Sequence, residues 1–246
     1  MYDALDVRDL CKNYEGFTLD SVSFTLPAGK VMGFVGQNGA GKTTTIKLIL
    51  NMIQRSSGEI KVYGLDNIAD ELAIKQQLAA VFDEIFFVDA WRVREVEAVI
   101  KGFYSGWDSA LYASHLKNFE LSVDKHIKDL SRGMKMKLML AVAMSHGAKL
   151  LILDEPTSGL DPVARDELLD ILRDYVSDGE KSVFFSTHIT SDLERCADLI
   201  TLIEHGRIYF SGSEADLLAK FRPKLGESTT IDDILIHISK EVARHE

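Results

Sequence analysis

Cysteine, proline and long apolar runs are all scarce in this sequence of 246 residues. The 2 cysteines, Cys11 and Cys196, lie far apart and form no CxxC pair. We therefore expect neither a disulfide framework nor a zinc cluster, and we expect a reducing cytoplasm as the environment. No stretch reaches the roughly 18 apolar residues that a membrane-spanning helix needs. The opening residues, MYDALDVRDL, lack the basic and apolar segments of a signal peptide, so none is expected.

Basic residues are also fewer than acidic residues. Lys and Arg number 28 against 38 Asp and Glu, which gives a net charge of −10. Because nucleic acids are bound through clustered basic side chains, we expect no nucleic-acid partner. The apolar share of 46% is ordinary for a globular protein, and a chain of this length can form a core without cross-links.

Short apolar or alternating segments are interspersed with longer amphipathic ones, as strands and helices are in an α/β protein. From about residue 92 to about residue 147 the periodicity is helical, with little strand signal. We therefore predict an α/β fold with a mostly parallel sheet, interrupted by a helical insertion. The predicted strands are residues 5–11, 18–26, 30–35, 59–63, 78–82, 150–153, 182–186 and 199–204, and the predicted helices are residues 42–53, 94–103, 108–119, 131–146 and 162–176.

The most specific motif is GQNGAGKT at residues 36–43, which matches GxxxxGK[ST] between a predicted strand and a predicted helix. Glycines let the backbone wrap around phosphate oxygens with its N–H groups pointing inward, and the following helix adds its positive end. In such a loop Lys42 supplies a charge for the terminal phosphates, and Thr43 supplies a hydroxyl ligand for Mg²⁺. The predicted phosphate-binding residues are Gly36, Asn38, Gly39, Ala40, Gly41, Lys42, Thr43 and Thr44.

Two carboxylates, Asp154 and Glu155, directly follow the apolar segment 150–153. A buried strand that runs into two acids places them at the carboxyl edge of the sheet, where ligands bind in open α/β folds. Asp154 suits Mg²⁺, directly or through water. Glu155 suits an attacking water, as its general base or as the group that orients it. Beside a phosphate loop, this pair predicts a site for phosphoryl chemistry.

Several further segments, taken with these, resemble the ATP-binding-cassette (ABC) ATPases. Residues 130–134, LSRGM, are similar to the signature motif of that family, and residues 158–161, SGLD, are similar to its D-loop. His188 follows a predicted strand, where the family has a switch histidine. Tyr14 stands where the family keeps an aromatic that stacks on adenine, although packing alone would also explain an aromatic there. The resemblance runs from about residue 5 to about residue 213.

The resemblance assigns roles that the spacing alone does not. It implies that Ser131 and Gly133 complete the nucleotide site of a second ATPase subunit, where they contact the γ-phosphate, and that Asp161 of the D-loop is a nucleotide-binding residue. It implies that His188 contacts the γ-phosphate within its own subunit.

Two positions depart from the family pattern. Arg132 and Met134 replace a glycine and the glutamine of the usual LSGGQ signature. Asp83, followed by Glu84, occupies the place of the usual Q-loop glutamine. A carboxylate there can approach Mg²⁺, so Asp83 is a third candidate metal ligand besides Thr43 and Asp154.

As a member of this family, the chain would be a single ABC ATPase domain. Its expected parts are a phosphate-loop parallel-sheet core (1–85 and 148–212) with an N-terminal antiparallel β portion, an inserted α-helical subdomain (86–147) and a C-terminal helical tail (213–246). The resemblance implies ATP and Mg²⁺ as cofactors, and hydrolysis that drives a separate transmembrane permease. It also implies a homodimer or heterodimer of ATPase subunits, held peripherally at the cytoplasmic face of the cell membrane. The run 131–144 resembles the bacterial drug- and antibiotic-exporter subgroup.

Three alternatives remain at this point. A soluble ABC ATPase of DNA repair or translation usually carries two cassettes or a long coiled coil, and this chain is too short for either. A phosphate-loop phosphotransferase would not need the LSRGM segment. Finally, Phe86, Phe87 and Trp91 form either a small core of the insertion or a groove that receives a segment of the permease.

Overall fold

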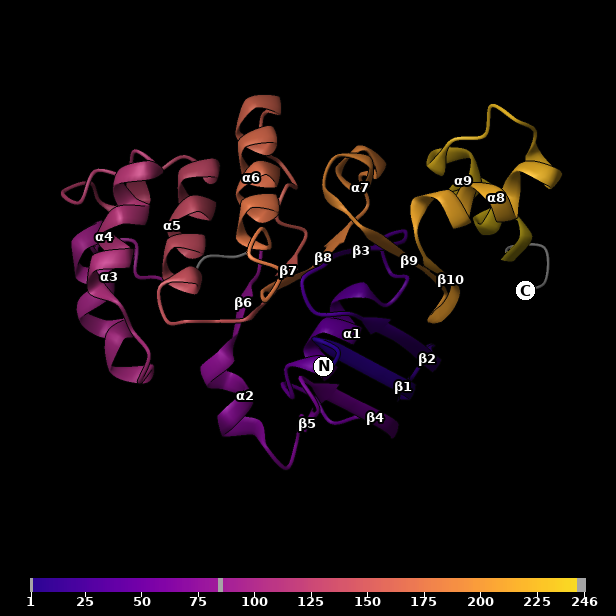
Figure 1. The fold of residues 1–246 in the computed structure, drawn as a ribbon, viewed down its shortest axis with the longest axis horizontal. Coiled ribbons are helices and arrows are strands. Elements are labelled where there is room, and N and C mark those ends of the chain that lie inside the picture. The colour runs from indigo at the N-terminus through magenta and orange to yellow at the C-terminus, as the bar shows by residue number, and fades with distance from the viewer. Residues whose placement is uncertain (1, 84–85, 243–246) are drawn as a thin grey trace.

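The computed structural model describes residues 2–83 and 86–242, so Glu84 of the expected Q-loop lies outside the described residues. Along the chain, an antiparallel β portion leads into an α/β core with a helical insertion, and two helices close the C-terminal part (Figure 1). Within the described ranges, none of the helices is long and apolar enough to cross a lipid bilayer.

The first sheet is antiparallel and comes from the N-terminal part of the chain. Strand β1 (Leu5–Tyr14) pairs with β2 (Phe17–Leu26) on one side and with β4 (Ser57–Val62) on the other, and the short β5 (Leu65–Asp66) adds to β4. Buried and exposed residues alternate along much of β2, as expected of a sheet that is covered on one face. The antiparallel β portion that the family resemblance implied is present.

The second sheet is largely parallel and carries the phosphate loop. Its strand order is β10 (Arg207–Gly212), β9 (Leu199–Glu204), β3 (Val31–Val35), β8 (Ser182–Thr187), β7 (Leu150–Asp154) and β6 (Leu78–Val81). The pairs from β9 to β6 are parallel, whereas β9 and β10 form an antiparallel hairpin. Because β3, β7 and β8 end at one edge, the loops that follow them meet there.

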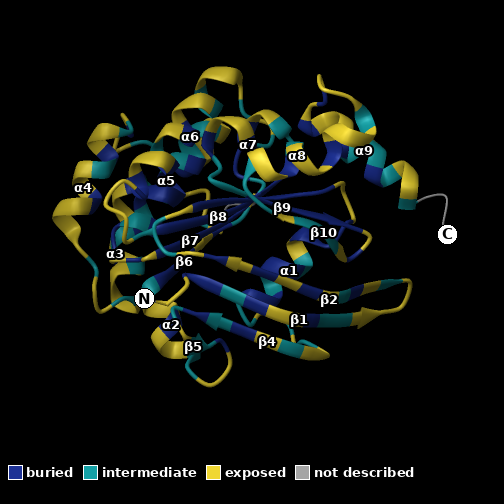
Figure 2. Cartoon of the chain, turned by 45° about the vertical axis from the view of Figure 1, so that its right-hand side comes forward, coloured by how far each residue is buried: buried dark blue, intermediate teal, exposed yellow. Residues whose placement is uncertain are grey.

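Both faces of this sheet are buried, which explains why its central strands are apolar without alternation. In β3, Val31 and Val35 belong to one hydrophobic cluster, and Met32 and Phe34 belong to the other, since successive side chains point to opposite faces. Helix α1 (Lys42–Ile49) lies between the two sheets (Figure 2). The opposite face is covered by α5 (Arg132–Met144), α6 (Pro162–Tyr175) and α7 (Thr190–Cys196).

The helical insertion has its own small core. It comprises α3 (Val93–Ile100), α4 (Ser109–Asn118) and α5, with 3₁₀ turns η1 (Lys101–Phe103) and η2 (Ile127–Asp129). Tyr112 and Leu138 are among its buried residues. Helix α5 also sends Met136 and Met139 into the core beside the main sheet. This one helix therefore connects the insertion to the α/β core.

The C-terminal part forms α8 (Glu214–Leu225) and α9 (Ile231–Val242), which bury Leu217 and Ile234 in the same core. The elements that were not predicted are α2 (Glu71–Gln77), α7, β5, β10 and the turn η2. Each is short, and β10 is an edge strand that buries little. Without a long apolar period, such elements leave only a weak signal in the sequence.

Candidate active site

The phosphate loop connects β3 to α1 through residues 36–41, as predicted. Gly41 has a φ of 112°, which side-chain-bearing residues rarely adopt, and it immediately precedes the helix. A methyl group on Gly36 would lie 2.2 Å from the carbonyl oxygen of Ile203. These two glycines thus allow the tight turn and the close approach to β9 that bring the loop over the start of α1.

Lys42 is buried and folded back onto its own loop. Its Nζ donates hydrogen bonds to the carbonyl oxygens of Gly36 at 2.7 Å and Gln37 at 3.2 Å, and it lies 3.1 Å from Oε1 of Glu155. The ammonium group therefore has partners for all three of its protons. A phosphate that draws Lys42 toward itself has to replace these contacts.

The predicted metal ligands Thr43 and Asp154 are in direct contact. The Thr43 hydroxyl donates to Oδ2 of Asp154 at 2.8 Å, and the hydroxyl of Ser186 donates to Oδ1 of the same carboxylate at 2.6 Å. Asp154 is 7% exposed. The contact from Ser186, at the end of β8, fixes the orientation of a carboxylate at the end of β7. Sequence analysis did not assign Ser186, although a polar residue directly after the apolar segment 183–185 was a usable signal.

Glu155 lies between two cationic or protonatable partners. Its Oε1 faces Lys42, and its Oε2 lies 2.7 Å from Nδ1 of His188. The backbone of Glu155 has a φ of 52°, and its N–H donates to the Ser186 hydroxyl at 3.0 Å. A non-glycine residue held in this left-handed region costs on the order of 1–3 kcal/mol, and such strain clusters at functional sites.

A cavity of about 420 Å³ opens above the loop and is bounded by Phe17 and Glu155. The predicted phosphate-binding residues that line it are Asn38, Gly39, Gly41, Lys42, Thr43 and Thr44. Gly36 and Ala40 make bonds within the loop instead: Gly36 accepts from Lys42, and the Ala40 N–H donates to the carbonyl oxygen of Gln37.

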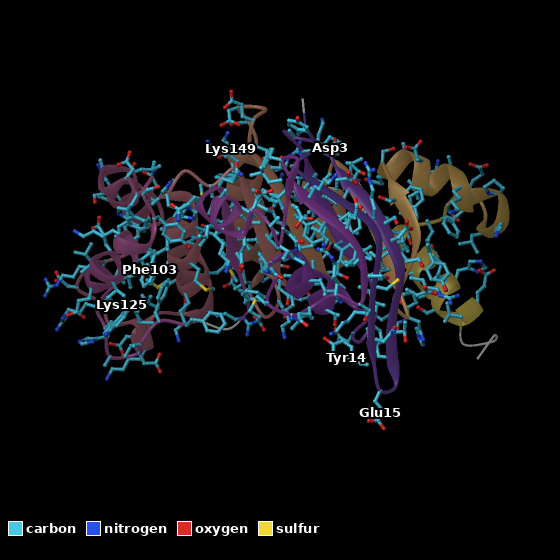
Figure 3. The ribbon with its side chains drawn as sticks, turned by 90° about the horizontal axis from the view of Figure 1, so that it is seen from below. Asp3, Tyr14, Glu15, Phe103, Lys125 and Lys149 are labelled. Carbon is cyan, nitrogen blue, oxygen red and sulfur yellow. The ribbon has the colours of Figure 1, made fainter. Side chains whose placement is uncertain are left out.

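The aromatic residue that lines this cavity is Phe17 rather than Tyr14. A methyl group on Gly41 would lie 3.1 Å from Cζ of Phe17, so the ring packs directly on the loop. Tyr14 lies near the tip of the β1–β2 hairpin, beside Glu15 (Figure 3), and Lys12 Nζ stands 5.1 Å from its ring centre. Phe17 was not predicted, because its position opposite Gly41 depends on the pairing of β2 with the core.

The remaining predicted residues lie at two helix starts. Ser131 caps α5, accepting from the Met134 N–H at 3.3 Å, and Asp161 caps α6, accepting from the N–H groups of Val163 and Ala164. A methyl group on Gly133 would lie 3.1 Å from Cβ of Ala164, so the two helix starts are close neighbours. Among the described residues, no recorded contact joins them to Lys42 or Glu155 of the same chain.

Asp83 lies apart from the other candidate metal ligands. Its carboxylate pairs with the guanidinium of Arg132, at the start of α5. In the described part of the chain it has no recorded contact with Thr43 or Asp154. A metal-binding role for Asp83 therefore stays a prediction.

The loops that carry Glu155 and His188 are tied together beneath the site by Asp192, a fully buried residue of α7. Its Oδ2 accepts from the hydroxyl of Thr157 at 2.5 Å and from that of Thr187 at 3.1 Å. Its Oδ1 accepts from Nε of Arg165 at 2.5 Å. One carboxylate thus connects the segment after Glu155, the residue before His188 and helix α6.

We expect Asp192→Ala to lower the free energy of unfolding by about 3 kcal/mol, because it strips a partly buried arginine and two buried hydroxyls of their common acceptor. Urea denaturation followed by far-UV circular dichroism measures this. Asp166→Ala removes an exposed carboxylate that pairs with Arg195, and it should change stability little. Equal midpoints for the two variants would contradict a stabilising role for the buried network.

Sequence comparison agrees with this geometry. The profile of the ABC transporter family matches residues 19–158, which run from β2 through the phosphate loop and the insertion to the loop after Glu155. The chain belongs to the ABC transporter family.

Relatives of this ABC domain include export proteins. The chain is 36% identical over 224 residues to the Nod factor export ATP-binding protein I of Rhizobium meliloti, an alignment that covers 83% of this chain and 62% of that protein. It is 31% identical over 214 residues to the bacitracin transport ATP-binding protein BcrA of Bacillus licheniformis, covering 85% and 69%. The chain thus spans less than two thirds of the length of the Nod factor export protein.

A solved structure described as the ATP-binding subunit of an ABC transporter superposes with a TM-score of 0.85 at 27% identity, covering 96% of this chain and 99% of that one. The predicted fold class and the resemblance to exporter-type ABC ATPases are therefore confirmed. In this ABC domain, LSRGM lies at the start of α5, and SGLD leads into α6.

Proposed function

We propose that this chain binds and hydrolyses ATP as the nucleotide-binding subunit of an ABC transporter, and that it drives a separate membrane permease. The observation that carries the proposal is the convergence of Lys42, Thr43, Asp154, Glu155 and His188 from three separate segments at one edge of the main sheet. A lysine, a hydroxyl and a carboxylate for Mg²⁺, and a group that activates water are the parts that phosphoryl transfer to water uses.

Lys42 and the loop amides bind the triphosphate. In the structure, the Lys42 ammonium group contacts Glu155 and two carbonyl oxygens. Phosphate oxygens offer a stronger, charge-assisted set of acceptors, so Lys42 turns to them when ATP enters. This exchange releases Oε1 of Glu155 from its ion pair, so that nucleotide binding itself prepares the general base.

Thr43 and Asp154 fit Mg²⁺. Both supply oxygen, the donor that this ion prefers, and they already lie within hydrogen-bonding distance of each other. Within the described residues no cluster of three or more His, Cys, Asp or Glu forms a metal cage, which is consistent with an ion bound through one or two protein oxygens plus phosphate. When bound, Mg²⁺ neutralises charge on the phosphate oxygens.

Glu155 accepts a proton from the attacking water as the water oxygen bonds to the γ-phosphorus and the bond to the β-phosphate oxygen breaks. His188, 2.7 Å from the same carboxylate, holds Glu155 in position and reaches the γ-phosphate side of the site. Ser186 orients the backbone of Glu155 and the Asp154 side chain together.

A second ATPase subunit completes the site in this proposal. The start of α5 offers free N–H groups, the Ser131 hydroxyl and a glycine that permits close approach, which together suit an anion. We propose that Ser131 and Gly133 serve the nucleotide of the partner; within the described residues they are not in contact with the phosphate loop of their own chain. Asp161 holds the adjoining start of α6 in place.

The partner permease is proposed to dock beside β6. Phe87 and Trp91 pack against the core of the insertion, which supports the packing interpretation for these two. Phe86, in contrast, is 74% exposed and lines an apolar cavity of about 170 Å³ together with Phe82 and Tyr104. Exposed aromatics of this kind are favoured in interface cores. Binding there would hold the chain at the cytoplasmic face of the membrane. The similarity to export proteins supports an exporter.

The proposed ATPase function is tested by measuring the release of inorganic phosphate from ATP in the presence of Mg²⁺, with water as the only acceptor. Acceptor-independent hydrolysis supports an ATPase, whereas release only with an added acceptor would favour a phosphotransferase. No described feature favours the DNA-repair or translation alternative. A neighbouring gene for a protein with several transmembrane helices would support the permease.

We expect GTP to compete with ATP within about tenfold, equivalent to about 1.4 kcal/mol, because stacking on an aromatic ring tolerates any base. Competition against a fluorescent ATP analogue measures the ratio. Phe17→Ala and Tyr14→Ala, compared side by side, show which ring carries the stacking. A preference for ATP of several orders of magnitude would mean that base-edge contacts exist that we have not identified.

A further inference from the structure

Arg132 occupies a position that helix electrostatics disfavours. It is the first residue of α5, directly after the cap Ser131, and the first turn of this helix contains no acidic residue. A cation at a helix N-terminus opposes the positive end of the helix dipole. Its presence there therefore depends on an anion supplied by another part of the chain.

Asp83 is that anion. Its carboxylate forms an ion pair with Arg132, and it follows β6, whose last residue Val81 is level with Leu153 of β7. Two residues beyond Leu153 stands Glu155. The pair therefore lies at the same sheet edge as the hydrolytic carboxylates, and it joins this edge to the start of α5.

The Arg132 guanidinium also contacts the D-loop. A methyl group on Gly159 would lie 3.1 Å from Cζ of Arg132 and 3.2 Å from its Nε, and Gly159 has a φ of 67°. One side chain thus bridges three segments that the function needs: the LSRGM helix start, the end of β6 and the SGLD loop. The side chains of Arg132 and Asp83 are 46% and 47% exposed, so an approaching subunit can cover them.

We propose that Arg132 and Asp83 act as one positioning unit, which sets the start of α5 against the core so that Ser131 and Gly133 can meet the nucleotide of a partner subunit. The proposal rests on the ATPase function inferred above. Each residue departs from the family pattern. Asp83 supplies the anion that offsets the Arg132 charge at the helix start, and Arg132 supplies the cation that neutralises Asp83.

The effect is expected on subunit closure and not on nucleotide binding by the single chain. Half-exposed ion pairs contribute little to stability in water, where both charges are well solvated. Closure removes water from the pair, and interactions between charges strengthen as the local dielectric falls. The Lys42 site does not contact either residue among the described contacts, so ATP affinity of the monomer should stay unchanged.

A charge swap tests the unit. We expect Asp83→Arg and Arg132→Asp singly to lower kcat about tenfold, and the double variant to recover to within about threefold of the wild type. Arg132→Asp places an acid at the helix start, where it is favourable, so loss of activity cannot come from an unfolded α5. The swap Lys137→Glu with Glu167→Lys exchanges the α5–α6 ion pair, whose charges lie 2.6 Å apart, and serves as the matched control with unchanged kcat.

Nucleotide affinity, dimerisation and hydrogen exchange are measured on the same variants besides kcat. Fluorescent-nucleotide affinity should be the same in all variants, and ATP-dependent dimerisation in the Glu155→Gln background should weaken in the single variants and return in the swap. Hydrogen exchange of the amides of residues 131–135 should be faster in the single variants and restored in the swap.

The outcomes separate this inference from the proposed function. If the wild type hydrolyses ATP but the swap stays as slow as the single variants, Arg132 acts by its own charge and the positioning unit is wrong. If the wild type neither hydrolyses ATP nor dimerises, the proposed function fails, and hydrogen exchange alone decides whether the pair orders the start of α5. If the single variants keep the wild-type kcat and the wild-type rate of amide hydrogen exchange, the proposal that Arg132 and Asp83 form a positioning unit is wrong.

Discussion

Replacement of Glu155 by Gln is expected to lower ATP hydrolysis by about 100-fold or more, the usual scale of a lost general base, while ATP binding remains. Gln retains the size and hydrogen-bonding capacity of the side chain but cannot accept the proton of the attacking water. The amide also has no negative charge, so it no longer repels the γ-phosphate. Phosphate release at saturating ATP measures the effect. Glu194→Gln, an exposed position on α7, is the control and should hydrolyse ATP normally.

The same variant should trap a closed dimer in the presence of ATP. Desolvation at a closing interface strengthens every charge interaction, so removing the Glu155 charge favours closure while blocked hydrolysis prevents reopening. In this dimer, Ser131 and Gly133 of one subunit contact the phosphate that Lys42 of the other subunit binds. Size-exclusion chromatography with and without ATP reveals the dimer.

Two results decide whether the altered LSRGM segment works in this way. A dimer that reverts to monomer on adding Ser131→Phe would support contact of the segment with the partner nucleotide. If the Glu155→Gln variant binds ATP but remains a monomer at every concentration, the chain does not form a homodimer. The signature would then be defective, or the partner would have to be a different ATPase chain.

Lys42→Ala is expected to abolish tight ATP binding. In the proposed mechanism Lys42 turns to the terminal phosphates, so its loss leaves their charge under-compensated. The structure adds a second reason: without Lys42, the carboxylate of Glu155 loses the partner that lies 3.1 Å away and faces the phosphates unneutralised. Titration with a fluorescent nucleotide measures the affinity.

Lys47→Ala is the matched control for Lys42, because it removes the same charge from the last turn of the same helix. Its affinity for nucleotide should equal that of the wild type. If Lys42→Ala bound as tightly as Lys47→Ala, the loop amides would suffice for binding, and the role given to Lys42 would be wrong. The double variant Lys42→Ala with Glu155→Gln should regain part of the affinity if repulsion by Glu155 contributes.

Segments with a clear apolar pattern and contiguous motifs could be predicted, whereas several short elements without such a pattern could not. The strands β3, β7 and β8 and the helices α4 and α6 lie within a few residues of their predicted ranges, because the strands are largely continuous apolar runs and the helices are amphipathic. Helix α7 has 7 residues and was missed, although its Asp192 ties the Glu155 and His188 segments together. The importance of Asp192 comes from three partners that are distant in the sequence.

The sequence by itself determined the α/β class, the phosphate loop and the candidate roles of Lys42, Thr43, Asp154 and Glu155. These follow from residues that are neighbours along the chain, where one strand, one turn and one helix start fix their relative positions. Only the tertiary structure decided which distant groups meet. His188 reaches Glu155, Phe17 lines the cavity at the phosphate loop, and Asp83 pairs with Arg132, 49 residues away. Such contacts depend on strand order and helix packing, which a linear pattern does not encode locally.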